Sequence, residues 1–182
     1  MSNPFKFAIA SSLVLTSFCF GQIFAKDKET LQISSTSFQA NQEIAKKYTA
    51  DGEDVSPQIT ISMLPTGTKS VALSCEDPDA PVGTWFHWLI WNISPSAKEL
   101  SEGILPKQEL ADGSIQGLND FKKTGYNGPS PPKGPAHHYH FKVFALDKKL
   151  DLKANSDKNA FYSAIKDHLL GTGEVVGLYG RK

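Results

Sequence analysis

Apolar and polar residues alternate along several short segments of the chain. Residues 59–63 place apolar side chains at every second position, which is typical of a strand with one buried face. Residues 139–146 show the same alternation, and residues 31–35 indicate a short edge strand. Residues 71–75 and 175–179 are apolar runs that also predict strands. The pattern therefore predicts a chain made mainly of short strands.

Residues 86–93 differ from these segments because apolar side chains occupy nearly every position. A strand that is buried on both faces has this composition. The chain that follows, residues 94–135, is irregular and rich in proline and glycine. Irregular stretches of this length are uncommon inside a compact domain and generally mark functional loops.

One segment near the end of the chain predicts a helix. Ser156 or Asp157 can cap a helix over residues 158–170, and Gly171 follows it. Its buried stripe is marked by apolar residues at intervals of four, namely Phe161, Ile165 and Leu169. There is no βαβ alternation, internal repeat or interdomain linker in the sequence. We predict a mainly β fold, an antiparallel β-sandwich with peripheral helices, including this C-terminal helix.

Composition and charge exclude some classes of binding partner. The chain has 182 residues, of which 40% are hydrophobic and 21% are charged, as expected of one soluble domain. The formal net charge is +0, and the sequence contains no basic block or stripe. A nucleic acid or an anionic membrane surface is therefore not an expected partner.

The N-terminal segment has the layout of a secretory signal peptide. Lys6 is its only charge before an apolar run at residues 7–20, and charged residues begin abruptly at Lys26, after the small residue Ala25. This order of a charged region, an apolar core and a small residue is typical of signal peptides.

We predict a signal peptide at residues 1–25 and a single domain at residues 26–182. The protein would then be exported, periplasmic or secreted, with no transmembrane span after cleavage. A retained membrane anchor is the alternative, but the apolar run is shorter than the roughly 20 residues that a span needs. Lipidation at Cys19 is disfavoured by the bulky Phe18 before it.

Cleavage would leave Cys75 as the one cysteine of the mature chain. A single thiol cannot form an internal disulfide. Cys75 lies in a predicted strand, so we interpret it as a small buried hydrophobic residue, with a catalytic thiol as the alternative.

Two stiff loops carry the side chains with binding chemistry. Residues 77–81 (Asp-Pro-Asp-Ala-Pro) follow a predicted strand and precede His87, and residues 128–139 combine Gly, Pro, His and Tyr. Proline fixes φ and glycine permits positive φ, so polar side chains in such loops point in set directions. We interpret the two segments as opposite walls of one small pocket. We also expect a cis peptide between Ala80 and Pro81, which would turn the chain back.

These motifs resemble the two signature regions of the phosphatidylethanolamine-binding proteins, also called Raf kinase inhibitor proteins. The resemblance rests on residues 77–81, on His87 before Trp88 and on residues 128–139, and it is greatest to the bacterial branch of the family. Membership would imply a Greek-key β-sandwich with a small anion-binding pocket near one end. By motif match, the ligand-binding residues would be Asp77, Pro78, Pro81, His87, Ser130, Pro131, Pro132, His137 and Tyr139.

The sequence departs from the family pattern at a few positions. His138 stands where the family often has Arg, Ser130 where Gly or Cys is common, and Ile61 where Trp is frequent. The first two would lie at the rim of the pocket, where they bear on the choice of ligand.

The chemistry of these side chains suits a phosphate monoester. Imidazole N–H, phenol O–H and loop backbone N–H groups donate hydrogen bonds to phosphate oxygens. His87, His137, Tyr139 and the loop around Ser130 would supply them, while Asp77 would orient a histidine or face an ammonium group. We therefore expect a non-enzymatic binding protein for a phosphoethanolamine-like ligand or a phospholipid headgroup. An inhibitor or modulator of a partner protein is compatible with this expectation.

Two other chemistries compete with binding. Ser130, His137 and Asp77 are the residue types of a hydrolase triad, although the chain has no Gly-x-Ser-x-Gly elbow at Ser130. The cluster of His137, His138 and His140 with Asp77 suggests a metal. Neighbouring strand residues such as His137 and His138 point to opposite faces, and the chain has no recognised zinc spacing, so we expect neither a metal site nor a cofactor. Other residues near the motifs have simpler interpretations: Asp79 as a turn cap, the tryptophans as core and His140 as a packing or solvent-facing residue.

The layout of the N-terminal segment gives a first testable prediction. We expect the mature protein to begin at or near Lys26 and to lie outside the cytoplasm, because the apolar run and the small residue Ala25 form an export and cleavage signal. Intact-mass measurement of the exported protein checks this. Retention of residues 1–22 in a membrane fraction would contradict it.

Overall fold

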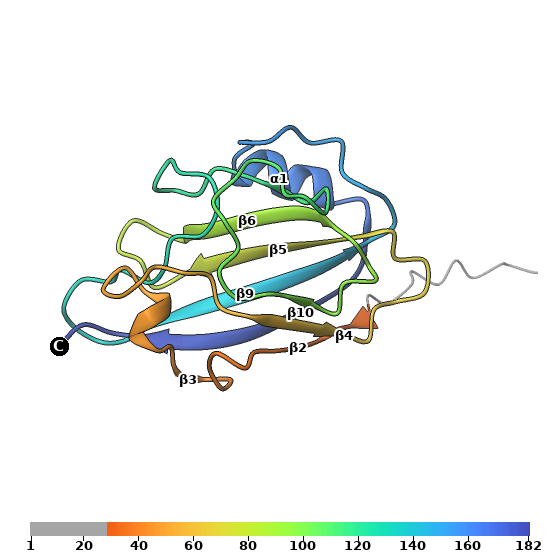
Figure 1. Cartoon of the computed structure of the whole chain (residues 1–182). Helices are drawn as coiled ribbons and strands as arrows, with labels where there is room; N and C mark the ends of the chain where they lie inside the picture. The colour runs from red at the N-terminus through yellow and green to blue at the C-terminus, as the bar shows by residue number, and fades with distance from the viewer. Residues whose placement is uncertain (1–28) are drawn as a thin grey trace, which may run out of the picture.

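The computed structural model describes residues 29–182, and over this range the protein is mainly β, as predicted (Figure 1). The strands are β1 (Glu29–Thr30), β2 (Gln32–Ser34), β3 (Gln42–Glu43), β4 (Ile59–Ser62), β5 (Ser70–Asp77), β6 (Trp85–Ile93), β7 (Glu99–Leu100), β8 (Ile115–Gln116), β9 (His137–Leu146) and β10 (Leu169–Tyr179). The helices in this range are the α-helix α1 (Lys158–Ile165) and the short 3-10 helix η1 (Lys46–Tyr48).

The described strands form a large sheet and a small sheet. The large sheet has the order β1-β10-β9-β5-β6-β8, with β3 also paired to β10, and the small sheet has the order β2-β4-β7. Pairs within both sheets are antiparallel except for β1 and β3, which run parallel to β10. The prediction of an entirely antiparallel fold is therefore wrong at the β10 edge of the large sheet. The sheet is mixed there, because β1 and β3 run beside β10 in the same direction. The Greek-key connectivity stays a prediction.

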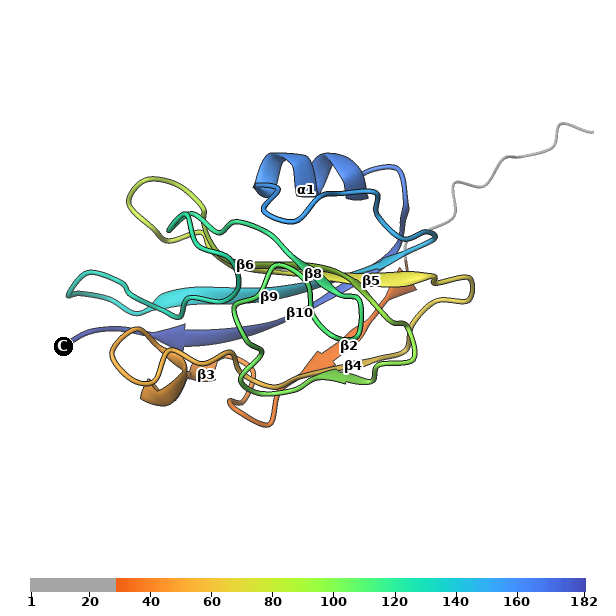
Figure 2. The ribbon, with the colours of Figure 1, turned by 45° about the horizontal axis from the view of Figure 1, so that its top comes forward.

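The large sheet is covered on both faces. A first hydrophobic cluster, which includes Ile59 and Leu73, fills the space between the two sheets, and a second, which includes Ala72 and Phe161, lies between the large sheet and α1. Figure 2 shows α1 on one side of the large sheet and β2 and β4 on the other. Neighbours such as Ala72 and Leu73 point into different layers, because side chains alternate along a strand. Central strands buried on both faces explain the continuous apolar run at residues 86–93.

Strand β6 contains two irregularities that change which face a residue occupies. Trp88 packs between the sheets, whereas Phe86, two positions earlier, packs toward α1. Residues two apart on a regular strand share a face, so an extra residue must lie between them. The register with β5 shifts at that point, which makes His87 the extra residue of a β-bulge. A second shift accompanies Asn92, whose φ is 59°.

The predicted helix is present but shorter than expected. Asp157 caps it as predicted, since its Oδ1 accepts from the N–H of Ala160 at 3.0 Å. The helix ends at Ile165, so the prediction that it extends to residue 170 is wrong. Leu169 instead begins β10, where it pairs with Leu146 of β9. Pairing with a long neighbouring strand overrides the four-residue periodicity there.

Two further expectations concern the chain backbone. The prediction of a cis bond before Pro81 is wrong, because no peptide bond in residues 29–182 is cis. The predicted signal peptide and Cys19 lie outside the described residues. Within them, no helix is long and apolar enough to cross a membrane.

One end of the large sheet gathers the two motif segments. Strand β5 ends there at Asp77, β6 begins at Trp85, β9 begins at His137 and β10 ends at Tyr179. The antiparallel pairings between these strands place the four residues side by side at this end (Figure 1). The loops that precede β6 and β9 are therefore neighbours, although about fifty residues separate them in the sequence.

The layer between the sheet and α1 gives a stability prediction. Phe161 is fully buried and contacts the rings of Trp91 and Phe144. Replacing it with Ala should lower the free energy of unfolding by about 3–5 kcal/mol, because a cavity would remain under the helix. Urea unfolding of the Phe161→Ala variant measures this loss. The exposed helix position Ser163 provides the control, since Ser163→Ala should change stability by less than about 0.5 kcal/mol.

Candidate ligand-binding site

A cavity of about 210 Å³ lies at the end of the sheet where the motif loops meet. Its lining comes from the two motif segments, from the first residues of β6 and from Phe121 in the chain between β8 and β9. The lining residues are Asp77, Ala80, Pro81, Val82, Trp85, His87, Phe121, Ser130, Pro131, Pro132 and His137. Most of the residues predicted from the sequence are therefore brought together. The lining does not include Pro78 or Tyr139, and sequence reasoning missed Ala80, Val82, Trp85 and Phe121. A larger hollow of about 320 Å³ beside Arg181 contains no histidine in its lining, so the chemistry of the smaller cavity distinguishes it.

Asp77 and His137 form the polar centre of the cavity. The Nδ1 atom of His137 lies 2.8 Å from Oδ2 of Asp77, and both side chains are largely buried, with 11% and 5% of their surfaces exposed. The other carboxylate oxygen, Oδ1, accepts from the backbone N–H of Asp79 at 2.9 Å. A carboxylate accepts hydrogen bonds, so Nδ1 of His137 carries a proton and Nε2 remains for a ligand. Asp77 therefore orients the histidine and is the counter-ion of its imidazolium form.

The bulge in β6 orients His87. Its ring lies edge-on to those of Phe121 and Tyr139, at centroid distances of 5.3 and 5.2 Å. Nδ1 of His87 lies 2.7 Å from the backbone carbonyl of Asn127. The bulge thus directs a buried strand residue toward the second loop, which is a common role of bulges beside binding sites.

The surroundings of His87 favour the neutral form of its ring. Burial lowers the pKa of this imidazole, because only 2% of the residue is exposed. The carbonyls of Asn127 and Gly128 and the carboxylates of Asp77 and Asp54 oppose the shift without overcoming it.

Tyr139 lies behind the cavity. It is fully buried, and its hydroxyl has no hydrogen-bond partner within the described residues. Burial, and after it the negative charge of Asp77, raises the pKa of the phenol, so the hydroxyl stays protonated. Tyr139 therefore supports the His87 ring by contact and does not line the cavity itself.

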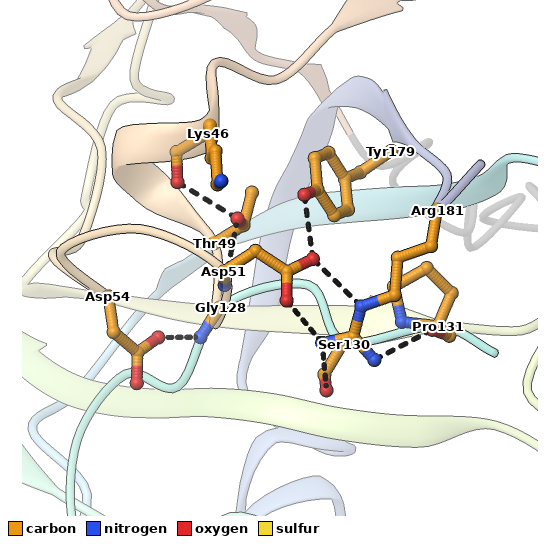
Figure 3. A network of polar contacts seen from close by, with 9 residues as sticks. All are labelled: Lys46, Thr49, Asp51, Asp54, Gly128, Ser130, Pro131, Tyr179 and Arg181. Atoms are coloured by element: carbon orange, nitrogen blue, oxygen red, sulfur yellow. Dashed lines mark hydrogen bonds and ion pairs between the residues drawn. The ribbon is translucent and has the colours of Figure 1, made fainter. Parts of the chain in front are cut away.

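Arg181, two residues after β10, holds in place the second wall of the cavity, which is the loop at residues 128–139 (Figure 3). Its Nη1 donates to the Pro131 carbonyl at 2.9 Å, and its Nη2 donates to the Ser130 hydroxyl at 3.1 Å. The same guanidinium donates from Nε and Nη2 to both oxygens of Asp51, at 2.7 Å each. Tyr179 adds a hydrogen bond to Asp51 at 2.8 Å. Sequence reasoning gave no role to Arg181, because its partners are 50 and 130 residues away along the chain.

The start of the second loop is fixed by Asp54. Its Oδ1 accepts from the N–H of Gly128 at 2.6 Å (Figure 3). Its Oδ2 accepts from the side chain of Asn127 at 3.0 Å. A Cβ atom at Gly128 would lie 2.3 Å from the carbonyl oxygen of Tyr48, so only glycine fits. These contacts set the direction of the Asn127 carbonyl that accepts from His87.

The neighbouring polar residues have other partners. The turn after β5 is capped by Asp77, which accepts from the N–H of Asp79, and not by Asp79 as the sequence suggested. The Oδ2 atom of Asp79 instead accepts from the backbone N–H and from Nδ1 of His138, at 2.8 and 2.7 Å. These bonds, the side-chain one first, lower the pKa of Asp79. His140 lies 3.0 Å from Glu174 and does not line the cavity. No group of three or more His, Cys, Asp or Glu residues within residues 29–182 could hold a metal ion.

Two predictions about individual side chains can be compared with the structure. Trp88 and Trp91 are fully buried core residues as predicted, whereas Trp85 lines the cavity, so its assignment to the core was wrong. Cys75 is fully buried, and burial raises the pKa of its thiol far above the ordinary value. A buried thiol of this kind is unreactive, which supports its interpretation as a small hydrophobic residue.

Comparisons with known proteins agree on one family. The family model described as phosphatidylethanolamine-binding protein matches residues 34–180. A UPF0098 protein of Pyrococcus horikoshii is 43% identical over 186 aligned positions that cover all of this chain and 91% of the relative. The crystal structure of E. coli YbcL, described as a member of the mammalian PEBP family, is similar with a TM-score of 0.78 and 31% identity over 85% of this chain and 100% of YbcL. The structure of a PEBP homologue from Chlamydia trachomatis gives a TM-score of 0.76 and 34% identity, over 84% of this chain and 99% of the homologue.

The Asp51–Arg181 pair predicts an acid-dependent loss of stability. Hydrogen bonds from Arg181 and then Tyr179 lower the pKa of Asp51 from 3.8 to about 2. A depressed pKa in the folded state adds stability that is complete above the unfolded value and is lost as pH falls through the folded value. The difference in unfolding free energy between wild type and Asp51→Asn should thus be constant from about pH 7 to 5 and shrink from about pH 4 to 2.

Urea unfolding at each pH measures this difference. In an Arg181→Gln background the same comparison should lose most of its pH dependence, because the main donor to Asp51 is gone. A difference between wild type and Asp51→Asn that stays constant down to pH 2 would contradict the prediction.

Proposed function

Because the chain belongs to the phosphatidylethanolamine-binding protein family, we propose that its cavity binds the phosphate of a phosphoethanolamine-like ligand. The observation that carries this proposal is the Asp77–His137 pair, which is buried at the cavity and has a free Nε2 atom. The free Nε2 atom becomes an N–H donor when the imidazole is protonated, and a buried carboxylate–imidazolium pair suits an anionic oxygen better than an apolar ligand.

The size of the cavity favours a small polar group. Its volume of about 210 Å³ lies below the roughly 300–1,000 Å³ of sites that enclose drug-sized ligands. It would hold a phosphate and a few further atoms, with the remainder of a larger molecule outside. A phospholipid headgroup and a free phosphate monoester both meet this description.

The walls of the cavity would strengthen electrostatic contacts. Much of the lining is apolar and includes Val82, Trp85, Phe121, Pro131 and Pro132. Charge-assisted hydrogen bonds gain strength where water is excluded, and each contributes about 1.5–3 kcal/mol. The stiff second wall also reduces the entropy lost on binding, since Arg181 already holds Ser130 and Pro131 in place.

The hydrolase alternative has less support. A serine nucleophile needs a hydrogen bond to a general base. Within the described residues, the Ser130 hydroxyl bonds to Arg181, which is a donor and cannot take a proton. His137, the base that the sequence offered, is bound through Nδ1 to Asp77 and has no contact with Ser130 among the described hydrogen bonds.

Binding to His137 gives a pH-dependent prediction. The affinity for O-phosphoethanolamine should rise as pH falls from about 8 to 6, because an imidazole that gains a proton gains a second N–H donor. The lowered pKa of His87 keeps that ring neutral, so His87 does not supply the added donor. Replacing His137 with Ala should weaken binding about tenfold or more and reduce the pH dependence, as measured by calorimetric titration.

His140 provides a matched control for this substitution. It lies on the same strand but pairs with Glu174 away from the cavity, so His140→Ala should leave affinity and pH dependence nearly unchanged. Equal affinity of wild type and a folded His137→Ala variant would show that the ligand does not bind in this cavity.

A further inference from the structure

The cavity presents a hydrogen-bond acceptor as well as donors. We infer that His87 makes the site selective for a ligand that itself donates a hydrogen bond, so that it binds a singly protonated phosphate monoester in preference to a sulfate ester of the same shape. This inference rests on the proposed function, because it concerns the form of the anion that the same cavity takes. It assigns to His87 the opposite role from the donor that the sequence predicts.

The tautomer of His87 follows from its partner. The carbonyl oxygen of Asn127, 2.7 Å from Nδ1, has no hydrogen to donate. The hydrogen of this bond must therefore be on Nδ1. In the neutral ring, Nε2 then carries a lone pair and accepts hydrogen bonds.

The orientation of the ring is also fixed. Phe121 and Tyr139 both contact it edge-on, and only 2% of the residue is exposed. Rotating the ring to present Nδ1 to the cavity would break the hydrogen bond to the Asn127 carbonyl. The Nε2 atom has no partner within the described residues, so it is the polar atom that the ring offers to the cavity.

The charges around His87 favour an anion of low charge. The titratable groups near the ring are the carboxylates of Asp77 and Asp54, the imidazole of His137 and the phenol of Tyr139, whose raised pKa keeps it uncharged. Burial lowers the pKa of His87 despite both carboxylates, which supports the neutral form. The described lining includes no lysine or arginine, and the guanidinium of Arg181 is bound to Asp51, Ser130 and Pro131. A doubly charged phosphate would face Asp77 with only His137 to balance it.

A phosphate monoester with one proton matches both histidines. One of its anionic oxygens accepts from Nε2–H of charged His137, and its P–OH group donates to Nε2 of His87. A sulfate monoester has the same shape and the same single charge but no hydrogen on its oxygens at this pH. One of its oxygens would face the His87 lone pair, and a site built for a hydroxyl rejects a ligand that lacks it.

The test compares methyl phosphate with methyl sulfate by calorimetric titration of the full mature chain at about pH 5.5. Methyl phosphate is mostly singly charged at this pH, since its second pKa is about 6. We expect it to bind the wild type at least about tenfold more tightly than methyl sulfate. The preference should fall as pH rises to about 8, because methyl phosphate loses its proton and methyl sulfate does not change.

Two variants separate the roles of the histidines. His87→Phe keeps an aromatic ring but removes the acceptor, so the preference should fall to about one. His137→Asn should weaken both ligands and preserve the preference. A similar affinity of wild type for the two esters, a preference unchanged at pH 8, or a preference retained in His87→Phe would each overturn the inference.

The outcomes also distinguish this inference from the proposed function. Equal binding of both esters in the cavity would leave the anion site standing and remove the selectivity. Failure of both esters and of O-phosphoethanolamine to bind at any pH would remove the anion site itself. If His87→Phe does not fold, the wild-type preference and its change with pH decide the question.

Discussion

The two hydrogen-bond ladders of β9 are the interaction on which the candidate site depends. Strand β9 pairs with β5 on one side and with β10 on the other over most of its length. These ladders place the end of β5, with Asp77, beside the start of β9, with His137. The two residues can therefore meet at 2.8 Å in a buried position, where an unpaired carboxylate would be strongly unfavourable. The carboxylate–imidazole pair is thus a product of strand register, and the loops complete the cavity around it.

Strand periodicity allowed most of the fold to be predicted from the sequence. The alternating segments and the apolar run of β6 are strands, as predicted. A strand buried on one face has apolar residues at alternate positions, and a strand buried on both faces has a continuous apolar run. The end of the helix was mispredicted because Leu169 fits a helical stripe and also a strand beside Leu146. Local pattern cannot decide between these, since the choice depends on a partner that is distant in sequence. The parallel edge of the sheet was missed for the same reason.

The site was predictable in its residues but less so in its chemistry. Proline-rich loops after apolar runs indicated that Asp77, His87 and His137 belong together, and the structure places them around one cavity. The contacts that set their hydrogen-bonding roles could not be predicted, because they involve backbone carbonyls such as that of Asn127 and the distant side chain of Arg181. Histidine was expected to donate at both positions. The direction of a hydrogen bond to His87 became clear only when the partner of its other nitrogen was known.

The two bulges of β6 have a consequence for comparing related chains. Side chains at alternate positions of a regular strand share a face, and each bulge exchanges the two faces. Between the bulges, the even-numbered residues Trp88 and Ile90 lie between the sheets. Outside them, the even-numbered Phe86 packs toward α1 and the odd-numbered Ile93 lies between the sheets. A gap-free alignment with a relative whose strand is regular would therefore match inter-sheet residues of one chain to helix-facing residues of the other. Such an alignment would treat Phe86 and Trp88 as residues of the same hydrophobic layer, although Phe86 packs toward α1 and Trp88 packs between the sheets. Reliable comparison in this region requires a one-residue gap at each bulge, with sheet register in place of sequence position as the guide.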